Sequence, residues 1–338
     1  MIEIPELSFN FGDLWKMLIA PVRSKLLLTA IELKVFNHLS KPVSADAVAK
    51  SMGTHPRNTE LFLDGLAAID LVLKKNGLYQ NAAISETFLV EGTQTYLGQL
   101  LTFMARADSP LENLSKLVKE GPPPPPETSQ FSEEMLAQGA LMMANSERAG
   151  DAQLVTREVS KLPEFPSFRK MLDLGGGPGI IGMAVVAAHP SMKGIIFDLP
   201  AVVKVAETFI KDYEMEDRMG TLSGDFNRDF IGEGYDLILA CNSLQFARDI
   251  DSVLKKIYDA LNYGGVFSSI YGFGQTHERT KPENLVLSLL SLALMGRDTS
   301  MFYRGFIADS MLRVGFKSVR SRTLNMGWGP VELDIARK

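Results

Sequence analysis

A glycine-rich turn between an apolar strand and an apolar helix is the feature that most constrains the fold of this chain. The run MLDLGGGPG covers Met171 to Gly179, and an apolar, helix-capable run follows from Ile180 to Ala188. Glycine allows positive φ and close approach of a ligand to the backbone, so such a turn is typical of nucleotide-binding loops. The next apolar strand, Gly194 to Phe197, ends in Asp198, a carboxylate placed to accept hydrogen bonds from a ribose. The sequence therefore predicts an α/β domain that binds a nucleoside.

The spacing of the glycines argues against a pyrophosphate ligand. The pattern is GxGxG rather than GxGxxG, and Pro178 removes one backbone donor from the loop. No lysine follows, as a P-loop would require. The loop therefore suits a nucleoside ligand without a pyrophosphate, and the alternative is a plain βα turn in an unrelated α/β protein.

Composition excludes several classes of partner. The 338 residues are 46% hydrophobic and 22% charged, with a formal net charge of −5. This balance is ordinary for a globular protein and disfavours broad electrostatic binding to nucleic acid or anionic membranes. The one cysteine, Cys241, excludes an internal disulfide and fits a reducing compartment. The sequence begins without a charged-then-apolar leader, and its longest apolar helical run, 285–295, is too short to cross a bilayer. We therefore expect a cytoplasmic protein with no nucleic-acid partner, no membrane partner and no metal.

The N-terminal third has the pattern of a winged helix. Ser44 can cap a short helix over 45–52, and a second helix is expected over 58–69. A small hairpin with its turn at Asn76-Gly77 follows as the wing. Such a module can bind DNA. The second helix carries Arg57, Glu60 and Asp64 and so has little net positive charge, which disfavours that role.

Five segments resemble motifs of the class I S-adenosylmethionine-dependent small-molecule O-methyltransferases, the family related to the plant caffeate and acetylserotonin enzymes. The resemblance rests on Asp173–Gly179, Ile195–Pro200 (IIFDLP), Ser223–Phe230 (SGDFNRDF), Tyr235–Phe246 and Leu254–Ile270. It implies a Rossmann-like methyltransferase domain preceded by a mainly α winged-helix dimerisation domain. The cofactor implied is S-adenosylmethionine, with S-adenosylhomocysteine as product.

The resemblance also implies a division of the chain and a homodimer. We expect a winged-helix dimerisation domain over 1–95, linking helices that contribute to the acceptor pocket over 96–165, and the S-adenosylmethionine-binding methyltransferase domain over 166–338. A proline spacer, GPPPPP over 121–126, interrupts the linking helices. A second apolar helix over 284–295 should close the other side of the pocket.

The family's motifs assign roles to individual residues of this chain. For the acceptor, the matching residues are Met142, Met143 and Phe246, although core packing is the alternative for either methionine. For the cofactor, they are Asp173, Gly175, Gly177, Gly179, Asp198, Leu199, Asp225, Phe226 and Asn242.

One position departs from the family. Gln245 stands where the plant-type enzymes have a histidine just past the fourth strand, and glutamine cannot act as a general base. It can still orient a bound acceptor. His277, in a loop after the strand expected over 266–271, is the alternative catalytic group, unless that loop is simply solvated. Glu332 aligns with an acidic position of the family; we take it as a surface strand carboxylate, with orientation of a catalytic group as the alternative.

The expected function is transfer of a methyl group from S-adenosylmethionine to a hydroxyl of a small, aromatic acceptor, by positioning rather than by a histidine base. Methylation of N, S or C, or cofactor binding without methylation, remains open because of Gln245. A winged-helix transcription regulator that senses a ligand is a further alternative.

Overall fold

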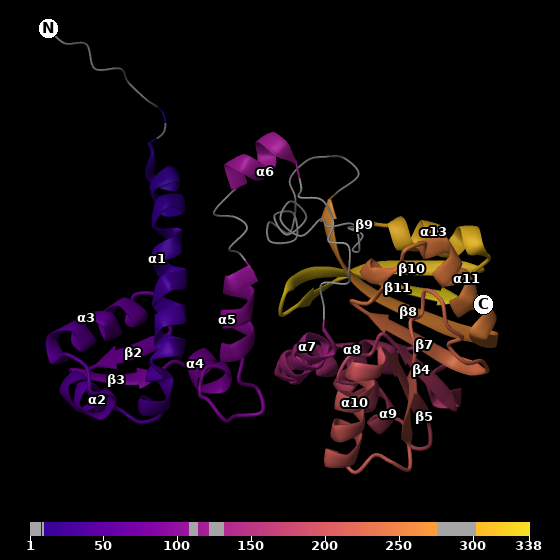
Figure 1. Cartoon of the computed structure of the whole chain (residues 1–338), viewed down its shortest axis with the longest axis horizontal. Coiled ribbons are helices and arrows are strands. Elements are labelled where there is room, and N and C mark those ends of the chain that lie inside the picture. Colours follow the sequence, from indigo (N-terminus) through magenta and orange to yellow (C-terminus); the bar gives the residue numbers. More distant parts are fainter. Residues whose placement is uncertain (1–7, 9, 108–113, 122–131, 276–301) are drawn as a thin grey trace, which may run out of the picture. The chain divides into compact units, whose positions relative to one another are not determined.

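The computed structural model describes residue 8 and residues 10–107, 114–121, 132–275 and 302–338. Contacts divide the chain into two units, Met1–Arg106 and Ala107–Lys338, each of which is described by itself (Figure 1). His277, the helix expected over 284–295 and the prolines of the spacer lie outside the described residues.

The first unit contains the helix, turn, helix and wing that the sequence predicts. Ser44 caps α2 (Ala45–Met52) through its Oγ, and α3 (Pro56–Ala67) follows. The wing is β2 (Val72–Lys75) and β3 (Leu78–Asn81), paired with β1 (Val43–Ser44) in the order β1-β3-β2. Around this module lie the long helix α1 (Gly12–Glu32), the 3-10 turn η1 (Val35–His38), α4 (Ala83–Phe88) and α5 (Gly98–Ala107).

Helix α1 buries only its C-terminal part. Ala30 and Ile31 belong to the core of the first unit. The N-terminal half leaves a series of large apolar side chains more than 40% exposed: Leu14, Trp15, Met17, Leu18, Ile19 and Val22. Exposed apolar surface of this extent is typical of an interaction site.

The second unit is built on a mostly parallel sheet, which confirms the α/β class. Its order is β10-β11-β8-β7-β4-β5-β6, with β8 through β6 parallel and β11 antiparallel to both neighbours. The strands are β4 (Lys170–Leu174), β5 (Lys193–Asp198), β6 (Met219–Ser223), β7 (Tyr235–Cys241), β8 (Leu261–Gln275), β10 (Ser318–Met326) and β11 (Gly329–Arg337), and β9 (Phe302–Tyr303) pairs with β8.

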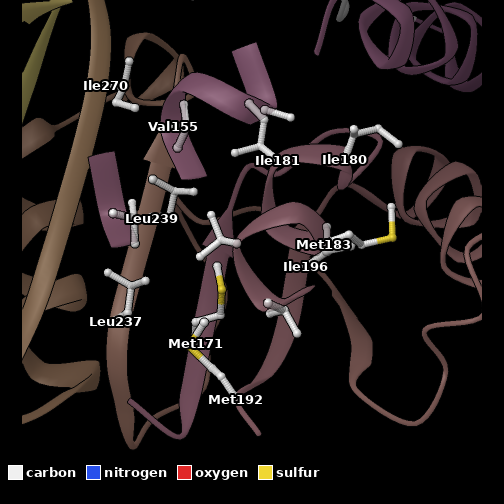
Figure 2. Packing of buried hydrophobic residues seen from close by; sticks show 14 of the residues in the cluster. Val155, Met171, Ile180, Ile181, Met183, Met192, Ile196, Leu237, Leu239 and Ile270 are labelled. Atoms are coloured by element: carbon white, nitrogen blue, oxygen red, sulfur yellow. The ribbon is translucent and has the colours of Figure 1, made fainter. Parts of the chain in front are cut away.

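Helices pack on both faces of this sheet. One face is covered by α8 (Ala152–Ser160), α9 (Ile180–Ala187) and α10 (Pro200–Asp212), and the other by α11 (Ile250–Ala260) and α13 (Phe306–Val314). Figure 2 shows the hydrophobic core on the α8–α10 face, which includes Val155 of α8, Ile181 of α9, and Met171 and Leu239 of the central strands. Before α8 lie α6 (Leu114–Glu120), α7 (Glu133–Ser146) and a π-helical turn, η3 (Glu147–Asp151); the 3-10 turns η4 (Phe165–Ser167) and η5 (Leu244–Phe246) complete the unit.

The bounds of strand β8 differ from the sequence prediction. Strand β8 begins at Leu261 and includes the Gly264-Gly265 pair, whereas a strand over 266–271 was expected. Antiparallel pairing with β11 continues beyond Tyr271 to Gly272, which lengthens the strand. Among the described residues, no helix is both long and apolar enough to span a membrane.

Candidate active site

The glycine loop leaves the carboxyl end of β4 and is fixed to the neighbouring strand β5. The Gly175 N–H donates to the Phe197 carbonyl at 2.7 Å. Gly175, Gly177 and Gly179 all have positive φ, a conformation that other residues rarely adopt. A Cβ at Gly179 would lie 2.2 Å from Ile196 Cδ1, so packing also requires glycine there.

Gly177 differs from the other two glycines because it faces open space. The nearest atom to a Cβ built on it is Glu147 Oε1, at 3.9 Å. Its N–H donates to Asp198 Oδ2 at 2.8 Å, while Asp198 Oδ1 accepts from the Leu199 N–H at 2.7 Å. Each carboxylate oxygen retains a lone pair for a second donor, such as a ribose hydroxyl. Leu199 is 36% exposed beside it, at the start of α10.

Carboxylates also occupy the start of α9. Glu147 Oε2 accepts from the Ile181 N–H at 3.2 Å. Asp173 is 1% exposed, and a Cβ at Gly182 would lie 2.5 Å from its Oδ2. Burial, then the neighbouring Asp198, raises the pKa of Asp173 to about 7. A free helix N-terminus attracts phosphate, but here the Ile181 N–H is already engaged by Glu147, and the two carboxylates disfavour a pyrophosphate.

The turn after β6 carries Asp225 and Phe226. Asp225 Oδ1 accepts from both the backbone N–H and the side-chain amide of Asn227, each at 2.9 Å. Asn227 Oδ1 in turn accepts from the Arg248 N–H at 2.8 Å, which ties this turn to the segment after β7. Phe226 is 9% exposed, and its Cε1 lies 3.7 Å from the position of a Cβ on Gly175. The structure therefore places the Phe226 ring beside the glycine loop.

The segment after β7 lies at the same carboxyl edge of the sheet as the glycine loop, since β7 pairs in parallel with β4. Asn242 has φ of +50°, uncommon for a residue other than glycine, and its N–H donates to the Ile270 carbonyl. Gln245 Nε2 donates to the Asn242 carbonyl at 2.6 Å. Phe246 is 49% exposed. Burial and the nearby Glu147, Asp173 and Asp151 raise the pKa of the Cys241 thiol, so it stays protonated.

Comparison with known proteins decides the family. The O-methyltransferase domain model matches residues 129–303, and the O-methyltransferase dimerisation domain model matches residues 15–91. The chain belongs to the O-methyltransferase family. It is thus an S-adenosylmethionine-dependent methyltransferase with a dimerisation domain before the catalytic one.

The sequence relatives include a named O-methyltransferase, and a solved structure shares the fold. The O-methyltransferase is 28% identical to the acetylserotonin O-methyltransferase of Bos taurus, over 93% of this chain and 94% of that one. An uncharacterized protein of Methanocaldococcus jannaschii is 29% identical over 72% of this chain, and the match spans 64% of that protein, just under two thirds. The crystal structure of human N-acetylserotonin methyltransferase in complex with SAM shares the fold, with a TM-score of 0.78, 23% identity and 99% coverage of both chains.

The residues around the glycine loop fit S-adenosylmethionine. An acidic group at the end of β5 suits a ribose, and the carboxylates at the start of α9 suit a cationic ligand better than a pyrophosphate. The open side of Gly177 leaves room for a ligand against the backbone. The same features disfavour a dinucleotide.

The acceptor residues expected from the sequence lie on two separate segments, α7 and the turn η5. Met142 and Met143 are half-buried on α7, four to five residues before Glu147.

The segment that carries Glu147 is also bound by the turn between β10 and β11. Ser146 Oγ accepts from Trp328 Nε1 at 3.0 Å, and Asp151 Oδ1 accepts from the Gly327 N–H. The turn between β10 and β11 therefore contacts the segment that carries Glu147.

The interpretation of Glu332 as a surface carboxylate is wrong. It is 4% exposed and accepts hydrogen bonds from the Tyr271 hydroxyl and the Gly305 N–H. These contacts join β8, β11 and the start of α13. His189 is likewise structural, because it is 1% exposed and its Nδ1 accepts from the Met192 N–H at 2.9 Å.

Three residues of the O-methyltransferase site escaped the sequence analysis. Ser243 Oγ donates to the Leu174 carbonyl, and a Cβ at Gly175 would lie 2.4 Å from Ser243 Cβ. Asn227 could have been found, since it follows Asp225 and Phe226 in the same motif. Glu147 carried no local signal, because only the fold brings it to the glycine loop.

Proposed function

We propose that this O-methyltransferase moves the methyl group of S-adenosylmethionine to a hydroxyl of a small aromatic acceptor that Gln245 helps to orient. The observation that carries the proposal is the pair of carboxylates, Asp198 and Glu147, on either side of Gly177. This arrangement suits a cationic nucleoside in a fold shared with acetylserotonin enzymes.

The cofactor would be held by backbone and side chains from three strand ends. Asp198 is assigned to the ribose, with Leu199 beside it, and Asp225 and Phe226 to the adenine. Asp173 and the glycines Gly175, Gly177 and Gly179 shape the loop, and Asn242 completes the site after β7. These assignments rest on the placement of each residue at the carboxyl edge of the sheet.

When bound, S-adenosylmethionine supplies an electrophilic methyl carbon on a sulfonium. In the transfer, the acceptor oxygen forms a bond to that carbon, the carbon–sulfur bond breaks with its electron pair left on sulfur, and the acceptor proton goes to solvent. Gln245 cannot take this proton. Its Nε2 is engaged with Asn242, and within the described part of the chain its Oε1 accepts no hydrogen bond, so this oxygen can orient the acceptor. A phenol acidic enough to ionise near neutral pH needs only such positioning.

The acceptor pocket and the subunit arrangement complete the proposal. Met142, Met143 and Phe246, with the linking helices over 96–165, are assigned to the pocket; His277 remains the alternative catalytic group. The chain would work as a homodimer through its N-terminal domain, 1–95, in the cytoplasm. The exposed apolar side chains of α1 and the match to a dimerisation domain support the dimer.

Two measurements test the function in order. Isothermal titration with S-adenosylmethionine should show binding, and its absence would contradict the proposal. A methyl-release assay over a panel of phenols and N-heterocycles should then favour phenols. Turnover of the N-heterocycles alone would instead support N-methylation, the second candidate, which Gln245 favours because a neutral nitrogen with a lone pair needs no base before attack.

A further inference from the structure

Glu147 is held against the glycine loop from outside the Rossmann motifs. It opens the π-helical turn η3, in which Gly150 has φ of 139°. Its Oε2 accepts from Ile181 at the start of α9, and its Oε1 lies 3.9 Å from the Cβ position of Gly177. The residue as a whole is half-buried, and its carboxylate is largely withdrawn from bulk water.

Within the described part of the chain, this carboxylate forms no ion pair, although Arg148 is its sequence neighbour. The adjacent Arg148 is directed elsewhere: its Nε donates to the Tyr213 hydroxyl at 2.7 Å and its guanidinium lies over the Phe209 ring. Its Nη1 donates to Asn145 Oδ1. A carboxylate removed from bulk water without a counter-charge is unfavourable, unless a cationic ligand supplies that charge.

We propose that Glu147 binds the ammonium group of the cofactor's aminoacyl tail. This inference rests on the proposed function, because it assumes that Asp198 holds the ribose. Asp198 and Glu147 approach Gly177 from different elements, the end of β5 and the turn η3. A nucleoside whose ribose is held by Asp198 would direct its aminoacyl tail toward Glu147.

The start of α9 indicates that Glu147 binds the ammonium of the cofactor rather than its sulfonium. The sulfonium is one carbon from the ribose ring, whereas the ammonium lies at the far end of the tail. At that end, the first N–H of α9, on Ile180, donates to no acceptor in the described ranges. It can bind the tail's carboxylate, which shares a carbon with the ammonium, while Glu147 binds the ammonium itself.

Electrostatics around Glu147 agree with a cationic partner. Burial raises the pKa of Glu147 well above its ordinary value, and the nearby Asp173 and Asp151 raise it further. The Ile181 N–H and Arg148 oppose this shift. An ammonium beside the carboxylate would favour its ionised form and relieve the repulsion among the three acids.

Titration with two neutral nucleosides tests the assignment. S-adenosylhomocysteine carries the aminoacyl tail, and 5′-methylthioadenosine lacks it. Glu147→Gln should weaken S-adenosylhomocysteine binding at least tenfold and change 5′-methylthioadenosine binding less than twofold. Glutamine keeps an oxygen for the Ile181 N–H, so the local fold is preserved. Glu207→Gln, on the exposed side of α10, is the matched control and should leave both affinities unchanged.

The outcomes separate this inference from the proposed function. Equal weakening of both ligands would mean that Glu147 only maintains the loop, and would overturn the assignment. Unchanged binding of S-adenosylhomocysteine would overturn it too. A loss for S-adenosylmethionine alone would place the sulfonium at Glu147 instead. If the unmodified protein binds none of these nucleosides, the proposed function fails first.

Discussion

The Asp198 carboxylate accepts a hydrogen bond from the Gly177 N–H at 2.8 Å, across 21 residues of sequence. This contact joins the tip of β5 to the glycine loop after β4 and holds the loop open on one side. The residue expected to bind the ribose therefore also shapes the backbone that faces the ligand. A substitution of Asp198 should therefore affect both the binding of the ribose and the conformation of the glycine loop.

Asp198→Ala should weaken binding of S-adenosylhomocysteine by roughly 1–3 kcal/mol, as expected when a charged hydrogen-bond partner is removed. Titration calorimetry measures this directly. Asp236→Asn is a suitable control, because Asp236 lies near the other end of the sheet and accepts from Arg169 and Lys170 N–H groups. Unchanged affinity in Asp198→Ala would show that the ribose binds elsewhere.

Replacement of Gln245 tests positioning against base catalysis. Gln245→Ala should lower turnover of a phenol, because the oxygen that orients the acceptor is removed while the cofactor residues remain. Unaltered turnover would exclude the orienting role.

Gln245→His restores a titratable group at the same position. With a weakly acidic phenol, its rate should rise with pH through about 6.5, the ordinary pKa of histidine. The unmodified protein should follow the ionisation of the phenol itself. Rate profiles over pH 5.5–9 distinguish the two, and identical profiles would argue that Gln245 does not face the acceptor.

The sequence predicted the site to the extent that its residues lie in contiguous motifs. The β4–loop–α9 unit and Asp198 follow local patterns of glycine, hydrophobicity and charge, and the Asp225–Phe226 pair lies in a segment that resembles a family motif, so their positions could be predicted. Glu147 could not, because a single glutamate in a helical segment looks like any solvated residue until the fold brings η3 to α9. Glu332 was misjudged for a similar reason: alternation along β11 does not reveal that a tyrosine hydroxyl and a backbone N–H enclose its carboxylate.

The exposed face of α1 predicts the subunit contact. Leu18→Glu would place a charge on this apolar surface and should convert a dimer to monomers, which light scattering after size-exclusion chromatography detects. Leu61→Glu on α3 is the matched control, since Leu61 is similarly exposed at 61%. A dimer that survives Leu18→Glu but not Leu61→Glu would place the interface on α3.

The raised pKa of Asp334 predicts how the stability of the folded protein depends on pH. Burial, with Glu332 as a further cause, raises its pKa to about 7, above the ordinary value near 4. The folded state then binds more protons than the unfolded state between these values, so stability should fall as pH rises from about 4 to 7. Asp334→Asn keeps an acceptor for the Ser321 hydroxyl but cannot ionise, so its melting temperature should decline less over that range. Asp249→Asn is the control, because the pKa of Asp249 is lowered by its hydrogen bonds to Ser252 and it stays ionised throughout. If the melting temperatures of the unmodified protein and of Asp334→Asn change with pH in the same way from pH 5 to 8, Asp334 is already ionised at the lower pH.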